Sequence, residues 1–230
     1  MKKLLFVLMI GIALIPTGCG TPSQTAKGTG IGAGAGAAAG AILGAIIGKD
    51  AKGAAIGAAI GTAVGAGTGA VIGRKMDKKA EELAALENAQ IETVTDNNGL
   101  KAIKVTFASG ILFPTNGTTL SSSAKSELKE FAQKMSDMTD TDITIFGHTD
   151  NTGTAEVNER ISAQRAAAVE SYLKSCGIAA SRMTAEGKSY NEPVASNDTA
   201  AGKAQNRRVE VFISANENMV KEANAEAGGK

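Results

Sequence analysis

The spacing of hydrophobic residues divides the chain into three unlike parts. An uninterrupted apolar run extends from Leu4 to Ile15 near the N-terminus. Glycine and alanine then dominate residues 28–73, with 15 of each among 46 positions. From about residue 93 apolar residues alternate with polar ones in some segments and recur every three or four residues in others, as in a globular domain. Each part therefore predicts a different kind of structure.

The C-terminal part predicts four strands and two helices. Alternation and helical spacing place these elements, in chain order, at residues 103–107, 124–138, 143–147, 157–172, 182–186 and 207–213. The order β-α-β-α-β-β predicts an α/β (α+β) fold, a mixed sheet with its helices on one face, over residues 93–215. The remaining residues 216–230 are predicted to be a disordered tail.

Glycines in the second part recur at every fourth position. Two such ladders flank a charged turn at residues 49–52. Their members are Gly32, Gly36, Gly40, Gly44 and Gly48, then Gly53, Gly57, Gly61, Gly65, Gly69 and Gly73. Residues four apart share a helix face, where glycine lets another backbone approach closely. We therefore expect an antiparallel helical hairpin over residues 28–73, embedded in a membrane or packed in an oligomer; the alternative is a flexible tether.

The apolar run at the N-terminus has the layout of a secretory signal. Lys2 and Lys3 precede it, and Pro16-Thr17-Gly18-Cys19 follows it. One interpretation is an ordinary signal peptidase site with a cysteine nearby. The sharper one is a lipobox, in which residues 1–18 are removed and diacylglycerol is joined to Cys19. A glycine at position 20, in place of aspartate, resembles lipoproteins that are sorted to the outer membrane.

Residues 74–92, between the glycine ladders and the globular part, are rich in charge. Lysines and glutamates surround a narrow apolar stripe at helical spacing. We expect this segment to be a solvated helical linker.

Composition excludes several classes of function. The chain has 24 Lys and Arg against 23 Asp and Glu, a net charge of +1, so no basic field favours nucleic acid as a partner. With one histidine and two cysteines it lacks the ligands of a Cys/His zinc centre, and no metal is expected. Glycine motifs that cradle nucleotides do not occur in it, and no cofactor is expected.

Three polar motifs of the C-terminal part resemble a known family. They are Gly147-His148-Thr149-Asp150-Asn151-Thr152-Gly153, the stretch from Asn158 to Ala166, and Asn206-Arg207-Arg208-Val209-Glu210. In this order they resemble the OmpA-like peptidoglycan-binding domain, and the whole chain resembles YiaD-type outer-membrane lipoproteins with a glycine zipper. The resemblance implies a non-catalytic protein with its C-terminal domain in the periplasm. It also implies that Asp150 and Arg165 hold the diaminopimelate of a stem peptide.

The chemistry of these residues agrees with that role. The end of diaminopimelate carries an ammonium and a carboxylate on one carbon, which an anion and a guanidinium can bind together. Asp150 follows a strand and Arg165 lies on the next helix, with Asn158 on nearly the same helix face. Thr149 and Asn151 are further candidates for contact. The alternative for Asp150 and Arg165 is a plain loop-to-helix salt bridge.

Three functions remain open at this point. The first is a lipid-anchored tether that binds peptidoglycan and joins the outer membrane to the wall through Cys19 and the hairpin, alone or as a homo-oligomer. The second is a hydrolase that uses His148 and Asp150. The third is a membrane-active protein in which the glycine ladders are the working part. We expect Asn206, Arg207 and Arg208 to have a structural role.

Overall fold

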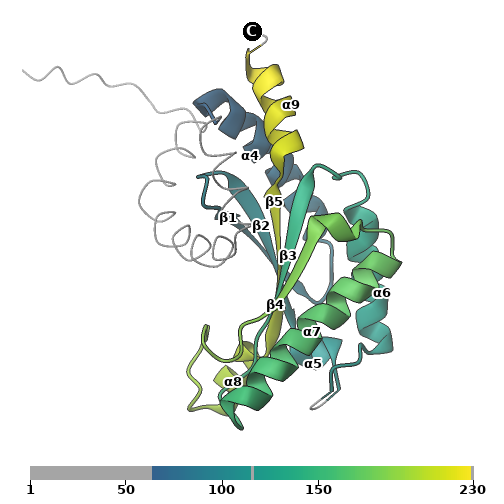
Figure 1. Ribbon diagram of the computed structural model, residues 1–230, viewed down its shortest axis with the longest axis vertical. Helices are drawn as coiled ribbons and strands as arrows, with labels where there is room; N and C mark the ends of the chain where they lie inside the picture. The colour runs from purple at the N-terminus through teal and green to yellow at the C-terminus, as the bar shows by residue number, and fades with distance from the viewer. Residues whose placement is uncertain (1–63, 115–116, 229–230) are drawn as a thin grey trace, which may run out of the picture.

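The computed structural model describes residues 64–114 and 117–228 (Figure 1). The predicted signal, Cys19 and most of the predicted helical hairpin lie outside the described residues. Within them the chain forms a five-stranded sheet in the order β1-β2-β5-β3-β4. The strands are β1 (Ala89–Thr95), β2 (Lys101–Ala108), β3 (Thr141–Gly147), β4 (Met183–Gly187) and β5 (Arg208–Ala215). Only β3 and β4 pair in parallel, so the mixed sheet is confirmed.

Alternation along the strands sorts their side chains onto two faces. In β2, Ile103, Val105 and Phe107 are fully buried, and Val105 lies opposite Val211 of β5. The intervening Lys104 points to the opposite face, where it pairs with a glutamate of β1. One face of the sheet therefore carries the main hydrophobic core.

Two long helices cover that apolar face (Figure 1). Helix α6 (Ser122–Lys134) begins after Ser121, whose Oγ accepts a hydrogen bond from the Ala124 amide at 3.0 Å. Helix α7 (Ala155–Ser175) is capped in the same way by Thr154 and ends before Gly177, whose φ of +102° favours glycine. The predicted helices on one face are confirmed. Shorter helical segments are α5 (Ser109–Leu112), η1 (Ala180–Arg182) and α8 (Ala200–Asn206).

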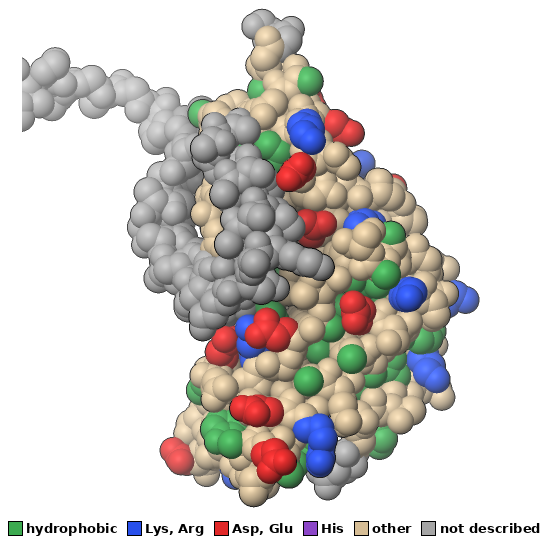
Figure 2. Space-filling view, viewed as in Figure 1, with side chains coloured by type: hydrophobic (Ala, Val, Ile, Leu, Met, Phe, Trp, Pro, Cys, Tyr) green, Lys and Arg blue, Asp and Glu red, His purple; other side chains and the backbone are tan. Residues whose placement is uncertain are grey.

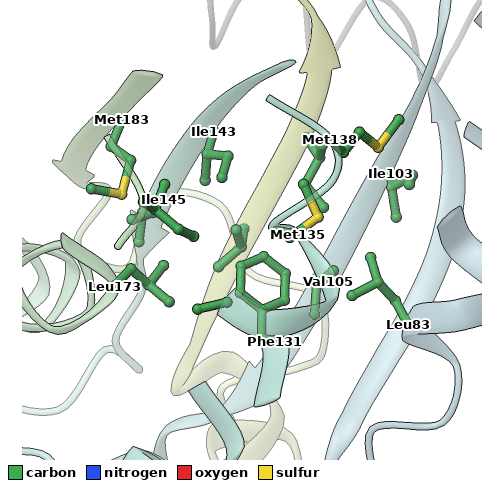
Figure 3. Packing of buried hydrophobic residues seen from close by; sticks show 14 of the residues in the cluster. Leu83, Ile103, Val105, Phe131, Met135, Met138, Ile143, Ile145, Leu173 and Met183 are labelled. Atoms are coloured by element: carbon green, nitrogen blue, oxygen red, sulfur yellow. The ribbon is translucent and has the colours of Figure 1, made fainter. Parts of the chain in front are cut away.

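The core is centred on Phe131 of α6 (Figure 3). Its ring meets Phe107 of β2 edge to face, with centroids 6.4 Å apart. Figure 3 shows Leu173 of α7 and Met183 of β4 on one side of Phe131 and Leu83 on the other. This packing joins both helices to the sheet, and so fixes α7 relative to the strand ends.

The first strand was not predicted. We expected a helical linker to residue 92, but helix α4 (Ala66–Leu83) ends earlier and β1 pairs antiparallel with β2. The turn between the strands is closed by Asp96, whose Oδ1 accepts from the amides of Asn98 and Leu100 at 2.9 Å. β1 is a half-exposed edge strand with few apolar residues, so its sequence shows little alternation. Its partner, rather than its own pattern, makes it a strand.

The predicted solvated linker is instead packed on the domain. In α4, Ile72, Met76 and Leu83 are fully buried. Lys79 is only 5% exposed, and its ammonium donates to Asp137 at 2.7 Å and to the Lys134 carbonyl at 2.8 Å. Charge along the segment indicated a solvated helix, but the carboxylate and carbonyl around Lys79 allow its burial.

The prediction of a disordered tail is wrong. Helix α9 (Glu217–Gly228) lies beside α4 (Figure 1). It buries Met219, Val220 and Ala223, and ion pairs link Lys75 and Arg74 of α4 to glutamates of α9 at 3.5 and 3.6 Å. The apolar stripe of α9 is short, and it is stabilised by contact with α4 rather than by local sequence.

Acidic and basic side chains are interspersed over the described surface in the view of Figure 2, as the small net charge predicts. None of the described helices combines the length and apolar character needed to cross a bilayer.

Candidate functional site

A hollow of about 900 Å³ lies at one end of the sheet, where β2 and β3 end and β5 begins. Its walls come from α5, the loop after β3, the first half of α7, and α8. It is lined by Ser109, Gly110, Phe113, Pro114, Thr149, Asp150, Thr152, Val157, Asn158, Ile161, Arg165, Ala200, Lys203 and Arg207. The hollow therefore brings together four of the five predicted ligand residues, Thr149, Asp150, Asn158 and Arg165.

Asp150 provides the single carboxylate that lines the hollow in the described part of the chain. Its Oδ2 pairs with Nη1 of Arg207 at 2.5 Å, and its Oδ1 accepts from the Thr152 amide at 2.8 Å. Burial alone would raise the pKa of Asp150, but the hydrogen bonds from Arg207 and Thr152 outweigh it and lower that pKa. The carboxylate is therefore held in its charged form.

Arg165 reaches the same hollow from α7 and is only 6% exposed. Its Nε donates to the Gly117 carbonyl at 3.1 Å, and its guanidinium lies 5.3 Å from the ring centre of Phe113. It forms no ion pair with any residue that the structure describes. Burial, with the nearby charge of Arg207, lowers the pKa of Arg165. Among the described residues the site thus holds a buried cation without an ion-pair partner, and the charge of Asp150 offsets its burial only in part.

The three other predicted ligand residues differ in burial: two are buried at the hollow and one is exposed. Asn158 is buried, and its Nδ2 donates to the Thr152 carbonyl at 3.0 Å, which fixes the loop that carries Asp150. Thr149 is also buried, and its hydroxyl has no hydrogen-bond partner among the described residues. Asn151, however, is exposed and does not line the hollow, so the structure does not support it as a contact residue.

Two glycines let α7 approach the sheet closely beside the hollow. A Cβ at Gly147 would lie 2.1 Å from the carbonyl oxygen of Ser162, and one at Gly187 would lie 2.5 Å from the amide nitrogen of Ala163. Any side chain there would displace α7. The glycines therefore help to set the position of Arg165 relative to Asp150.

The alternative interpretation, a plain salt bridge between Asp150 and Arg165, is not what the structure shows, because Asp150 pairs with Arg207. The motif at residues 206–208 has a mixed role. Asn206 and Arg208 are structural, as expected: Asn206 holds the 194–197 loop, and Arg208 pairs with Glu210 at 2.7 Å. Arg207 instead lines the hollow with a 42% exposed side chain. The sequence did not predict this position, since three adjacent polar residues gave no sign of which one faces the hollow.

His148 lies outside the hollow. It is 1% exposed, and its Nε2 is 3.7 Å from a carboxylate oxygen of Glu210. Burial, together with the charges of Arg208, Lys188 and Lys104, lowers the pKa of His148 to about 3. His148 therefore does not share the hollow with Asp150, and the low pKa keeps its imidazole neutral near pH 7. Across the described residues no three His, Cys, Asp or Glu side chains gather as metal ligands.

Comparison with known proteins identifies two segments. Residues 112–207 match the model of the OmpA family. This part of the chain is similar to the OmpA family. Residues 1–77 match the YMGG-like Gly-zipper family, in agreement with the two glycine ladders. The segment that matches the OmpA family thus contains Asp150, Arg165 and Arg207, at the end of the sheet.

Relatives and solved structures agree with this assignment. The probable lipoprotein YiaD of Escherichia coli K12 is 39% identical over 104 residues, which cover 45% of this chain and 48% of that protein. The peptidoglycan-binding protein ArfA of Mycobacterium bovis is 38% identical over 112 residues, covering 49% of this chain and 34% of ArfA. The chain thus spans less than half the length of either relative. The cell wall anchor of the T6SS from Pseudomonas aeruginosa is 27% identical, with a TM-score of 0.52, and the match covers 61% of this chain and 96% of that structure.

Proposed function

We propose that the segment that matches the OmpA family binds peptidoglycan by holding the free end of a diaminopimelate residue in the hollow. The observation that carries the proposal is Arg165. A guanidinium that is 6% exposed, without a carboxylate partner in the described chain, lies in the same hollow as a charged carboxylate. Burying a cation in this way is unfavourable unless an anion joins it. A ligand carboxylate supplies that anion.

The other charge of the ligand is matched by Asp150. A carboxylate accepts several hydrogen bonds at once, so Asp150 can receive a ligand ammonium while Arg207 remains beside it. Arg165 offers a planar pair of donors to the ligand carboxylate. Together the two residues match a zwitterion on one carbon, which is the chemistry of the diaminopimelate end. The names of ArfA and the Pseudomonas aeruginosa wall anchor support the same class of ligand.

Co-sedimentation with purified sacculi tests this function. We expect the wild-type protein to sediment with sacculi, and the Asp150→Ala variant to remain largely in the supernatant. Sacculi of an organism whose stem peptides carry lysine in place of diaminopimelate serve as the control. Equal sedimentation of the two proteins would place wall binding outside the hollow.

We further propose that the protein is an outer-membrane lipoprotein that tethers this membrane to the wall. Support comes from the N-terminal sequence, which ends in Thr17-Gly18-Cys19, and from the likeness to the lipoprotein YiaD. Mass spectrometry of the mature protein tests the anchor. A diacylated Cys19 as first residue is expected, and cleavage elsewhere or an unmodified thiol would contradict it.

A further inference from the structure

The hollow carries more positive than negative charge. Arg165, Lys203 and Arg207 line it, against the single carboxylate of Asp150. Arg207 is matched by Asp150 at 2.5 Å. Within the described chain, neither Arg165 nor Lys203 has an acidic partner. Two cationic side chains therefore remain for anions that a ligand would bring.

Lys203 stands at the rim of the hollow on α8. It is half-buried, and its Nζ lies 3.3 Å from Oγ1 of Thr152 on the loop opposite. The amide of Thr152 in turn donates to Asp150 at 2.8 Å. Thr152 therefore links the ammonium of Lys203 to the carboxylate that is proposed to hold the ligand ammonium.

The end of diaminopimelate uses only one of the two remaining cations. This step rests on the proposed function, in which the ammonium of the diaminopimelate end contacts Asp150 and the carboxylate contacts Arg165. This leaves Lys203 without a counter-charge. The residue that precedes diaminopimelate in a stem peptide is a glutamate joined through its side-chain carboxyl, so its α-carboxylate is free.

We propose that Lys203 forms a second anion subsite, which binds this free α-carboxylate of the neighbouring glutamate. The subsite recognises whether the glutamate is a free acid or has been amidated. A stem peptide with the free acid satisfies both Arg165 and Lys203, whereas an amidated one satisfies Arg165 alone. The protein therefore distinguishes two chemical forms of the wall.

The test measures binding of two tripeptides to the full-length protein by calorimetry. Both end in diaminopimelate. Its carboxyl group at the end of the peptide chain is amidated, so that it does not compete, while the ammonium and carboxylate at the other end of diaminopimelate stay free. One tripeptide has the free glutamate α-carboxylate and the other its amide. Wild type is expected to bind the acid form roughly two- to five-fold tighter, as for a partly exposed ion pair. Lys203→Gln, which keeps a hydrogen-bond donor to Thr152, should remove this difference by weakening the acid form alone.

Two further variants separate charge from structure. Lys203→Arg keeps the charge and should preserve preference for the acid form. Lys129→Gln removes an exposed lysine from α6, outside the hollow, and should leave both affinities unchanged. The preference of the wild type should also shrink with added salt, because the ion pair is screened.

Distinct results would overturn the inference. Equal weakening of both peptides by Lys203→Gln would mean that Lys203 only supports the Thr152 loop. Unchanged affinity for both would remove Lys203 from the site while leaving diaminopimelate binding intact. If wild type binds neither peptide, the proposed function itself fails, and the subsite fails with it.

Discussion

The Arg165→Met variant separates two contributions to stability: the unfavourable burial of the Arg165 charge and the favourable packing of its side chain. Methionine keeps much of the apolar stem against Phe113 but loses the guanidinium. The variant loses the hydrogen bond from Nε to the Gly117 carbonyl, worth about 0.5–1.5 kcal/mol, and the contact with the Phe113 ring, worth about 0.5–1 kcal/mol. It also removes a buried cation without a partner anion, whose desolvation costs several kcal/mol before compensation.

These contributions oppose each other, so the variant should be about as stable as wild type or slightly more stable. We expect its free energy of unfolding, from urea denaturation, to lie within about 1 kcal/mol of the wild-type value or above it. Binding should respond very differently. A ligand carboxylate left without its partner in a mostly buried site loses about 2–5 kcal/mol, which is roughly 30-fold or more in affinity.

Calorimetry with a diaminopimelate tripeptide measures the affinity. Arg160→Met is a matched control, because Arg160 is exposed on the same helix and does not line the hollow. It should bind as wild type does. If Arg165→Met binds the tripeptide normally but unfolds much more easily than wild type, then Arg165 is a structural residue and does not bind the ligand carboxylate.

Three further predictions concern the framework around the site. Met219→Asp should release α9 and expose the basic residues of α4 to trypsin, whereas the exposed Lys221→Ala should not; equal cleavage rates would argue against the α4–α9 contact. Gly147→Ala should lower stability to urea by about 1–3 kcal/mol or more, because its Cβ meets the Ser162 carbonyl, and an unchanged midpoint would contradict this contact. His148 has a pKa of about 3 in the fold and 6.5 as its ordinary value, so the unfolded chain binds its proton first. Stability should therefore fall as pH drops from about 6.5 towards 3, by at most about 1.4 kcal/mol per unit, and His148→Phe should flatten that part of a pH series of urea midpoints.

Much of the C-terminal fold was predictable because its elements carry strong local patterns. Apolar residues alternate along β2 and recur at helical spacing along α6, and serine or threonine caps begin both long helices. Asp150 and Arg165 were found from motif and chemistry together. Their meeting in one hollow follows from the order of strand, loop and helix, which sequence shows directly.

What sequence did not predict depends on contacts between distant segments. β1 and α9 each have too few apolar residues to be recognised alone, and each is stabilised by a partner elsewhere in the chain. The ion pair between Asp150 and Arg207 joins residues that are 57 positions apart. Lys203 was missed for the same reason, because only the fold brings α8 to the rim of the hollow.

A ligand that sits in the hollow should change the amide chemical shifts of the residues around it. A diaminopimelate tripeptide is titrated into isotope-labelled protein, with the lysine-containing tripeptide as control. We expect the largest shifts at Ser109, residues 149–152, Arg165 and Arg207, and much weaker shifts with the lysine peptide. Shifts of equal size with both peptides, or shifts concentrated away from these residues, would contradict it.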